Sequence, residues 1–273
     1  MKSMQMKALA LAVLGLAGFG VAGSALACPT IPTTTATPGG GGAWSTQTVT
    51  SATMSSQAGL NGTTCALGVA LNVGAQSNAK GLVKDNSPNN EARYRARFYV
   101  DTSQLTKLTA ANQQVDFMTV LAGSSPAGVS TTEVEVKLVG GTPLQVDFII
   151  ANTGAGGANN YQTIGLPMPN TGGKYRIEFD LQQGAQGGTC TVSSTAPTGG
   201  CFRYWVSDAA ATTAPDAATG AVSVTNTGWS GAKQANLGLA AANTKFRTAS
   251  VNPLGQTLVL DEFDSRRQTF IGK

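Results

Sequence analysis

Apolar and polar residues alternate with a period of two along most of the chain, which is the pattern of β-strands buried on one face. The alternating segments recur between clusters of glycine, asparagine and proline, and no long segment keeps a helical period. The pattern predicts about eleven strands, at residues 45–54, 66–72, 93–101, 115–122, 133–139, 144–151, 175–182, 202–207, 221–225, 234–239 and 256–264.

Strands with one polar side indicate antiparallel pairing, because strands of a parallel sheet are apolar on both sides. The expected fold is therefore all-β, with two antiparallel sheets packed as a β-sandwich. The composition agrees, since the chain has 34 glycines and only 12% charged residues, a profile of exported β proteins rich in turns. We expect a single domain over residues 44–273.

The segment before this domain has the pattern of a bacterial export signal. Residues 1–27 contain two lysines, then an apolar run, then small residues directly before Cys28. The run is too short for a membrane span, and residues 28–43, rich in proline, threonine and glycine, predict a tether. We expect a secreted, periplasmic or cell-surface protein with no transmembrane segment in the mature chain.

Charge and residue types exclude several kinds of partner and chemistry. Without the lysines of the signal the net charge is about +2, which implies neither a nucleic acid nor a membrane surface as partner. The chain contains no histidine, which excludes catalytic triads that need imidazole and histidine-ligated zinc.

Four cysteines in an exported protein predict disulfides. Cys190 and Cys201 enclose a loop of threonine, serine, proline and glycine, which indicates a hairpin connection closed by a disulfide. Cys28 has two alternatives. It forms a second disulfide with Cys65, or a lipoprotein peptidase acylates it and Cys65 stays a thiol. The even number of cysteines favours the disulfide over the lipid anchor.

Several segments, in their order, resemble a known family. They are RYRARFYVD at 93–101, VDFMTVLAGSS at 115–125, YRIEFDL at 175–181, YWVSD at 204–208 and LDEFDSRRQTFIG at 260–272. In this order they are similar to landmarks of bacterial laminin-G-like or concanavalin A-like jelly-roll domains, over most of the mature chain. The resemblance implies two curved antiparallel sheets of roughly six or seven strands each. Two departures are the replacement of the family's Trp-x-Asp-Gly turn at 205–209 and an insertion between residues 183 and 201.

The concanavalin-like fold includes glycoside hydrolases, which need a pair of carboxyl groups. The alternation places Glu133 and Glu135 on one strand face, but the next residue on that face is Lys137 rather than a third acid. Glu178 and Asp180 form a similar pair. Both pairs are more typical of a solvated strand face than of a catalytic site. We therefore expect a protein that is not an enzyme.

Arginines and one tryptophan are the predicted ligand-binding residues. Arg93, Arg95 and Arg97 form a line of cations suited to an anionic polysaccharide or phosphate. The alternative, which we favour, is pairing with carboxylates of neighbouring strands. Trp205, beside Arg203 on the face opposite the core, would stack on a sugar ring if exposed. Since large aromatic residues are usually buried, we favour a covered Trp205.

The loop KDNSPNNE supplies weak candidates for calcium. Asp85, Asn86 and Asn89 are oxygen donors, and laminin-G-like domains often hold calcium through such loops. An Asx-rich turn before the next strand explains the same residues. No other cofactor is expected.

Together these features predict an exported, non-catalytic, lectin-like sandwich that binds a carbohydrate or a cell-surface or matrix protein. The alternative is a structural subunit of a surface layer, filament or extracellular matrix, in which copies of the chain self-associate. A polysaccharide-cleaving glycoside hydrolase is the third and least favoured reading.

Overall fold

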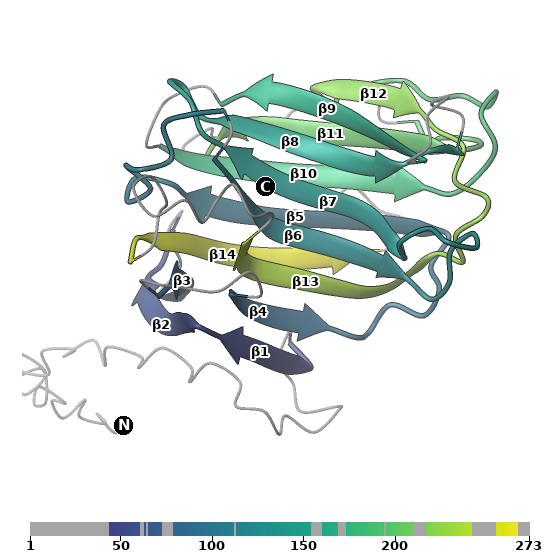
Figure 1. Ribbon diagram of the computed structural model, residues 1–273. Helices are drawn as coiled ribbons and strands as arrows, with labels where there is room; N and C mark the ends of the chain where they lie inside the picture. The colour runs from purple at the N-terminus through teal and green to yellow at the C-terminus, as the bar shows by residue number, and fades with distance from the viewer. Residues whose placement is uncertain are drawn as a thin grey trace, which may run out of the picture.

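The computed structural model describes two stacked sheets (Figure 1). Within the described ranges no helix has the length and hydropathy to cross a membrane. The described residues are 44–60, 63, 65–72, 79–111, 113–153, 160–168, 173–193, 195–209, 217–241 and 255–266.

Sheet A, which lies nearer the viewer in Figure 1, has the order β1-β4-β13-β6-β7-β8-β9. Its strands are β1 (Thr46–Thr50), β4 (Lys80–Asp85), β6 (Gln114–Ala122), β7 (Thr132–Val139), β8 (Gln145–Ala151), β9 (Tyr161–Pro167) and β13 (Ala232–Ala241).

Sheet B lies behind it, in the order β12-β11-β10-β5-β14-β3-β2. Its strands are β2 (Ala52–Ala58), β3 (Cys65–Leu71), β5 (Arg93–Asp101), β10 (Lys174–Gln182), β11 (Cys201–Asp208), β12 (Gly220–Ser223) and β14 (Thr257–Arg266). Neighbouring strands pair antiparallel, as the alternation predicts.

The core lies between the sheets and is built from the apolar side of each alternating strand. Phe98 of β5 packs edge-to-face on Phe117 of β6, with ring centroids 5.5 Å apart. Phe148 of β8 packs on Phe202 of β11 with centroids 5.4 Å apart. These aromatic pairs join one sheet to the other and contribute beyond the area they bury. The predicted all-β, two-sheet antiparallel sandwich is confirmed.

Three differences from the predicted strands have local causes. β4 and β9 are additional strands, and both are short segments with an internal glycine, which weakens the strand signal. β9 also ends at Pro167, which is tolerated because β9 is an edge strand. The predicted strand at 45–54 is two strands, because Ser51 has a positive φ of 45° and turns the chain from sheet A into sheet B.

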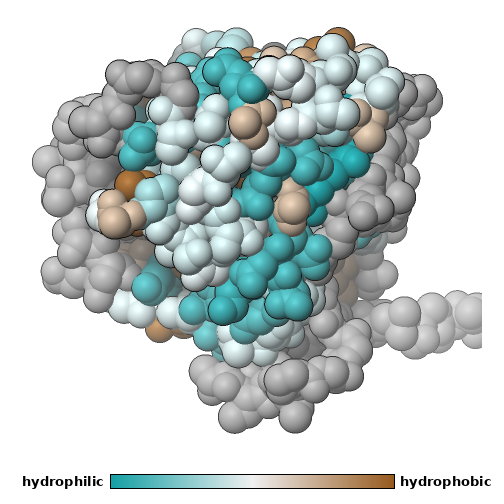
Figure 2. All heavy atoms as spheres, turned by 90° about the vertical axis from the view of Figure 1, so that its right-hand side faces the viewer, coloured by the Kyte–Doolittle hydropathy of each residue, from teal (hydrophilic) through white to brown (hydrophobic). Residues whose placement is uncertain are grey.

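The edges of the two sheets coincide. β9 and β12 lie together at the top of Figure 1, and β1 and β2 at the bottom. The described surface at the end of the sandwich on the right of Figure 1 has hydrophilic and intermediate residues, with only scattered hydrophobic ones (Figure 2). The fold thus offers three surfaces for function: the outer face of each sheet and the edge between β9 and β12.

Candidate functional site

The outer face of sheet B carries the predicted ligand-binding residues, and it is buried. The exposed fraction is 3% for Arg95, 1% for Arg203 and 1% for Trp205. Arg95 and Arg203 lie over the Trp205 ring, with their guanidinium carbons 5.0 and 5.8 Å from its centroid. The favoured reading of Trp205 as a covered residue is therefore confirmed.

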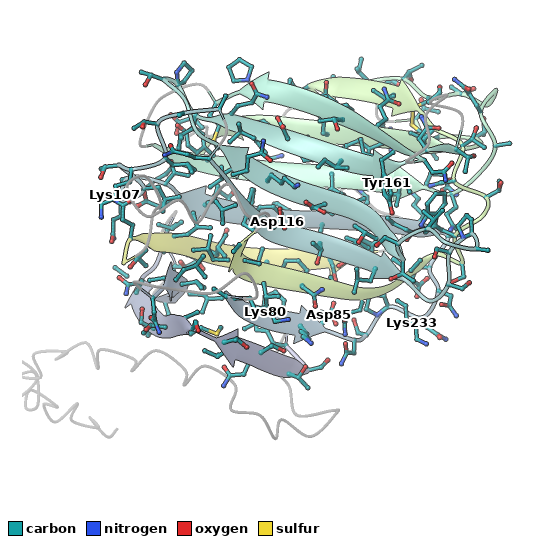
Figure 3. The ribbon with its side chains drawn as sticks, in the orientation of Figure 1. Lys80, Asp85, Lys107, Asp116, Tyr161 and Lys233 are labelled. Atoms are coloured by element: carbon teal, nitrogen blue, oxygen red, sulfur yellow. A yellow bond between two sulfur atoms is a disulfide. The ribbon has the colours of Figure 1, made fainter. Side chains whose placement is uncertain are left out.

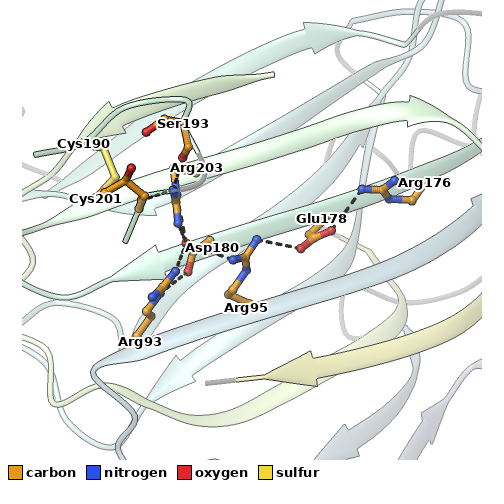
Figure 4. A network of polar contacts seen from close by, with 10 residues as sticks. Arg93, Arg95, Arg176, Glu178, Asp180, Cys190, Ser193, Cys201 and Arg203 are labelled. Atoms are coloured by element: carbon orange, nitrogen blue, oxygen red, sulfur yellow. Dashed lines mark hydrogen bonds and ion pairs between the residues drawn. A yellow bond between two sulfur atoms is a disulfide. The ribbon is translucent and has the colours of Figure 1, made fainter. Parts of the chain in front are cut away.

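Asp180 is the centre of a polar network on this face (Figure 4). Arg93 donates to it through Nε and Nη2, each at 2.9 Å. Arg203 also donates to Asp180, through Nε at 3.1 Å and through Nη2. Burial opposes ionisation of Asp180, but these hydrogen bonds and the charge of Arg95 outweigh it and lower its pKa. Asp180 is thus a stably ionised carboxylate.

Glu178 extends the network. It accepts a hydrogen bond from Arg95 at 3.0 Å and another from Arg176 at 3.3 Å. Arg97 lies further along, 4.0 Å from Glu262 of β14. The favoured prediction that the arginines pair with carboxylates of neighbouring strands is confirmed, whereas the expectation that Glu178 and Asp180 lie on a solvated face is wrong.

The insertion between β10 and β11 explains part of this burial. The predicted disulfide between Cys190 and Cys201 is present, with Cα atoms 5.4 Å apart. Arg203 Nη1 donates to the carbonyl oxygens of Ser193 at 2.7 Å and Thr195 at 2.9 Å, which holds the insertion against β11. The alternation could not reveal this cover, because it depends on an irregular loop. A ligand-binding role for these residues stays a prediction.

The remaining predicted sites are only partly described. Cys28 lies outside the described residues, so its disulfide with Cys65 and its alternative lipid anchor stay predictions. Asp85 accepts a hydrogen bond from the Ser87 backbone at 2.8 Å, as in the expected Asx turn. The described residues contain no group of three or more acidic or cysteine side chains placed to hold a metal ion. Calcium at Asp85, Asn86 and Asn89 stays a prediction.

The outer face of sheet A is different, because its central polar side chains are partly exposed. Two cross-strand rows run over it. The Glu135 row consists of Lys84, Asn236, Thr119, Glu135, Ile149 and Thr163. The Asp116 row consists of Lys80, Ala240, Asp116, Lys137, Asp147 and Gly165. Asp116 and Lys80 are labelled in Figure 3.

Two carboxyl groups and one ammonium group meet where these rows adjoin. Lys137 Nζ lies 2.7 Å from Glu135 Oε1 and 3.8 Å from Asp116 Oδ1. The three side chains are 15–22% exposed, so solvent and a ligand can reach them. We call these three residues the acid–base group.

The proton distribution of the acid–base group follows from its surroundings. Burial, the charge of Glu135 and the hydrogen bond to Glu135 raise the pKa of Asp116 to about 8, although Lys137 opposes this. Burial opposes the charge of Lys137, but the neighbouring carboxylates outweigh it and raise the pKa of Lys137. At neutral pH the group therefore holds a proton donor, Asp116, beside a cation, Lys137.

Polar groups with unused bonding capacity flank the acid–base group. Asn236 donates through Nδ2 to Thr119 Oγ1 at 2.9 Å, while its buried Oδ1 has no hydrogen-bond partner. Lys80 and Lys84 are partly exposed and form no ion pair with any described residue. The β4 side of the face is consequently a place where an anionic ligand would meet uncompensated positive charge.

Glu133 does not form the predicted pair with Glu135 on one face of β7. A register shift pairs Val120 with Val134 and Leu121 with Thr132, so Glu133 is the extra residue of a bulge. Its side chain is fully buried and accepts a hydrogen bond from Gln183 Nε2 at 3.0 Å. Burial raises the pKa of Glu133 to about 7. The prediction that Glu133 and Glu135 share one solvated face is therefore wrong.

Asp116 is the functional candidate that the alternation did not single out. A usable signal was present, because consecutive strands commonly pair and Asp116 interrupts an apolar run just before the strand that carries Glu135 and Lys137. That Asp116 lies opposite Lys137 could be known only from the pairing register of β6 and β7, which bulges shift.

The fold is similar to solved structures of polysaccharide lyases. An endo-β-1,4-glucuronan lyase from the fungus Trichoderma reesei has 14% identity over 83% of this chain and 91% of its own, with a TM-score of 0.56. An alginate lyase from Klebsiella pneumoniae has 8% identity over 74% of this chain and 81% of its own, with a TM-score of 0.49. The botulinum neurotoxin serotype G binding domain has 8% identity and a TM-score of 0.46 over 82% of this chain, which spans 44% of that domain. No protein-family model matches the sequence, and no curated protein is significantly similar to it.

The likeness to the glucuronan lyase agrees with a jelly-roll β-sandwich and corrects the functional prediction. The expectation of a non-catalytic, lectin-like or structural protein is contradicted, since the architecture on which it rested is matched here by a polysaccharide lyase. That expectation considered only pairs of carboxylates within single strands, Glu133 with Glu135 and Glu178 with Asp180. The exposed carboxyl pair of this chain joins two strands, β6 and β7.

Proposed function

We propose that the protein is a polysaccharide-cleaving enzyme and that its reaction takes place at the acid–base group on the outer face of sheet A. The observation that carries the proposal is the contact of Asp116, Glu135 and Lys137 on a partly exposed sheet face. The group combines a proton donor, a proton acceptor and a positive charge, the components of general acid–base catalysis. The fold likeness to a glucuronan lyase supports the same class of reaction.

The separation of the two carboxyl groups favours elimination over hydrolysis. Retaining glycosidases hold their carboxyl groups about 5–5.5 Å apart and inverting ones about 6.5–9.5 Å apart, so that a sugar carbon or water fits between them. The Lys137 ammonium group contacts both Glu135 and Asp116, at 2.7 and 3.8 Å, and so takes up the place of that sugar carbon or water. A lyase needs no attacking water, because the glycosidic bond breaks when a proton is removed from the neighbouring sugar carbon.

The residues divide this elimination between them. The Glu135 carboxylate takes the proton from the carbon next to a uronate carboxylate, and the electron pair forms a carbon–carbon double bond as the bond to the glycosidic oxygen breaks. Asp116 gives its proton to the leaving oxygen, and Lys137 stabilises the negative charge that develops on the uronate. Afterwards Glu135 gives its proton up and Asp116 takes one back through the solvent that reaches both partly exposed carboxyl groups.

The substrate class follows from the charges around the group. Lys80 and Lys84 have no ion pair among the described residues, and both lie on β4, two strands from Asp116. A neutral polymer would leave these ammonium groups without partners, whereas a polymer of uronic acids would supply carboxylates for them. We therefore assign an acidic polysaccharide as the substrate.

Two finer assignments belong to the same proposal. Export to the periplasm, cell surface or medium is supported by the disulfide between Cys190 and Cys201, which forms in oxidising compartments. The jelly-roll fold supports, at a coarser level, the resemblance to laminin-G-like or concanavalin A-like domains.

Product analysis tests the reaction and the substrate class. The protein would be incubated with polyuronates and with neutral glucans, while ultraviolet absorbance of unsaturated uronate and reducing ends are both recorded. We expect both signals with polyuronates and neither with neutral glucans. Lys84→Gln should raise KM several-fold, whereas Lys107→Gln, an exposed lysine outside sheet A, should not. Reducing ends without unsaturated product would show hydrolysis, and no product from any polymer would overturn the proposal.

A further inference from the structure

A groove lies between the edge strands of the two sheets, away from the acid–base group. It has a volume of about 670 Å³ and is lined by residues of β9 and β12 together with Asn152 and Gln186. The size lies within the range of about 300–1,000 Å³ that is usual for ligand sites. Tyr161, one of the lining residues, is labelled in Figure 3.

The chemistry of the lining indicates the kind of ligand. Its polar side chains are amides and hydroxyls, from Asn152, Tyr161, Gln162, Gln186 and Ser223, and no charged residue is among them. A lining of this kind matches a ligand that has many hydroxyl groups and no charge. Among the described lining residues there is no cation to compensate a carboxylate or phosphate.

Hydrogen bonds fix the orientation of the lining groups before any ligand arrives. Asn152 Nδ2 donates to Gln162 Oε1 at 2.8 Å, so Gln162 keeps its Nε2 donor for a ligand. Asn152 Oδ1 in turn accepts from the Thr225 backbone at 2.9 Å. Such pre-organisation reduces the entropy lost on binding.

Tyr161 gives the groove a rigid aromatic wall. Its hydroxyl group lies 3.1 Å from the Ser130 carbonyl oxygen and 3.0 Å from that of Thr132, and its ring packs edge-to-face on Trp229. Because the hydroxyl is already bonded, the ring contributes mainly its apolar surface. An aromatic surface held in place beside the amide of Gln162 suits a sugar ring, which has apolar C–H faces and polar edges.

The position of the groove connects it to the acid–base group. Glu135 pairs with Ile149 of β8, and Ile149 pairs with Thr163 of β9, so the Glu135 row leads directly to the strand that forms one wall of the groove. Two strand spacings separate Glu135 from β9, about 10 Å, which is roughly the length of two sugar units. A polymer bound across the strands of sheet A would reach the groove.

We infer that the groove between β9 and β12 is a subsite for uncharged sugar units of the polymer that is cleaved at the acid–base group. The inference rests on the proposed function and extends it: the substrate is a heteropolysaccharide that contains neutral sugars as well as uronates. The acidic units then meet Lys80 and Lys84, while the neutral units occupy the groove.

Binding of neutral oligosaccharides to the Glu135→Gln protein tests the inference without requiring cleavage. Hexasaccharides of glucose, mannose, galactose and xylose would be titrated by calorimetry or NMR. We expect at least one to bind, with affinity lowered about tenfold by Gln162→Ala and by Gln186→Ala, as loss of one hydrogen bond predicts. Gln104→Ala, an exposed glutamine in the turn after β5 and outside the groove lining, serves as control and should bind as the parent does.

The outcomes separate the subsite from the proposed reaction. Gln186 has an exposed side chain, so Gln186→Ala remains informative if Gln162→Ala impairs folding. Binding that both groove variants leave unchanged, or no binding of any neutral hexasaccharide at millimolar concentration, would overturn the subsite even if polyuronates are cleaved. Groove-dependent binding without cleavage of any polymer would support the subsite and count against the reaction alone.

Discussion

The outer faces of the two sheets carry alternating charged residues of the same kinds, yet the structure uses them in opposite ways. On sheet B, Asp180 is buried and receives hydrogen bonds from two arginines. On sheet A, Asp116 is partly exposed and meets a second carboxyl group and one lysine. Charges that are covered and fully paired stabilise a fold, whereas charges left partly exposed and unevenly paired are available for chemistry.

Removal of the central carboxylate of sheet B should have the largest effect on stability. Asp180→Ala leaves Arg93, Arg95 and Arg203 buried without their shared partner and should lower the free energy of unfolding by about 3–5 kcal/mol. Asp147→Ala on the outer face of sheet A is the matched control and should lower it by less than about 1 kcal/mol. Denaturant unfolding of both variants measures the difference. Equal losses would show that the two faces do not differ as described.

Glu133 tests whether burial alone determines the behaviour of a carboxyl group in sheet A. Its pKa is raised from 4.5 to about 7, so its protonated form stabilises the fold fully below pH 4.5, and this contribution is lost as pH rises through about 7. Glu133→Gln should therefore be more stable than the parent by about 1–3 kcal/mol at pH 8, with the difference vanishing near pH 4. Thermal unfolding across this pH range measures it, and a difference independent of pH would contradict the burial argument.

The titration of Asp116 should have a smaller effect, which is on the rate of cleavage. The proposed reaction needs Asp116 protonated, and its pKa is raised to about 8. Cleavage should decline by about tenfold per pH unit above pH 8, because the fraction of protonated Asp116 falls at that rate. The pH profile of kcat measures this decline. If the Asp116→Asn protein keeps the same pH profile of kcat, Asp116 takes no part in the reaction.

The alternation of apolar and polar residues was sufficient to predict the β-sandwich but not the candidate functional site. Strand period alone predicted that Arg95 and Glu178 lie opposite the core, and both do. It could not show that this face is covered, because the insertion that holds Arg203 has no period. Nor could it show that Glu133 turns inward, since one extra residue in a bulge reverses the face of a side chain.

The groove between β9 and β12 could not be predicted either, because one of its two strands could not be recognised in the sequence. β9 has a weak strand signal, with Gly165 inside it and Pro167 at its end. Without β9, neither the edge of sheet A nor its position beside β12 follows from the sequence. Sites built between strands distant in sequence become visible only when the order of strands in both sheets is known.

The most direct test of the account is the rate at which Glu135→Gln releases unsaturated product from a polyuronate that the parent protein cleaves. Glu262→Gln, a partly exposed carboxylate of sheet B, is the matched control. We predict a loss of roughly 10²–10⁴-fold in kcat for Glu135→Gln with an unchanged unfolding midpoint, and no loss for the control. Full activity of a folded Glu135→Gln protein would contradict the assignment of the reaction to the outer face of sheet A.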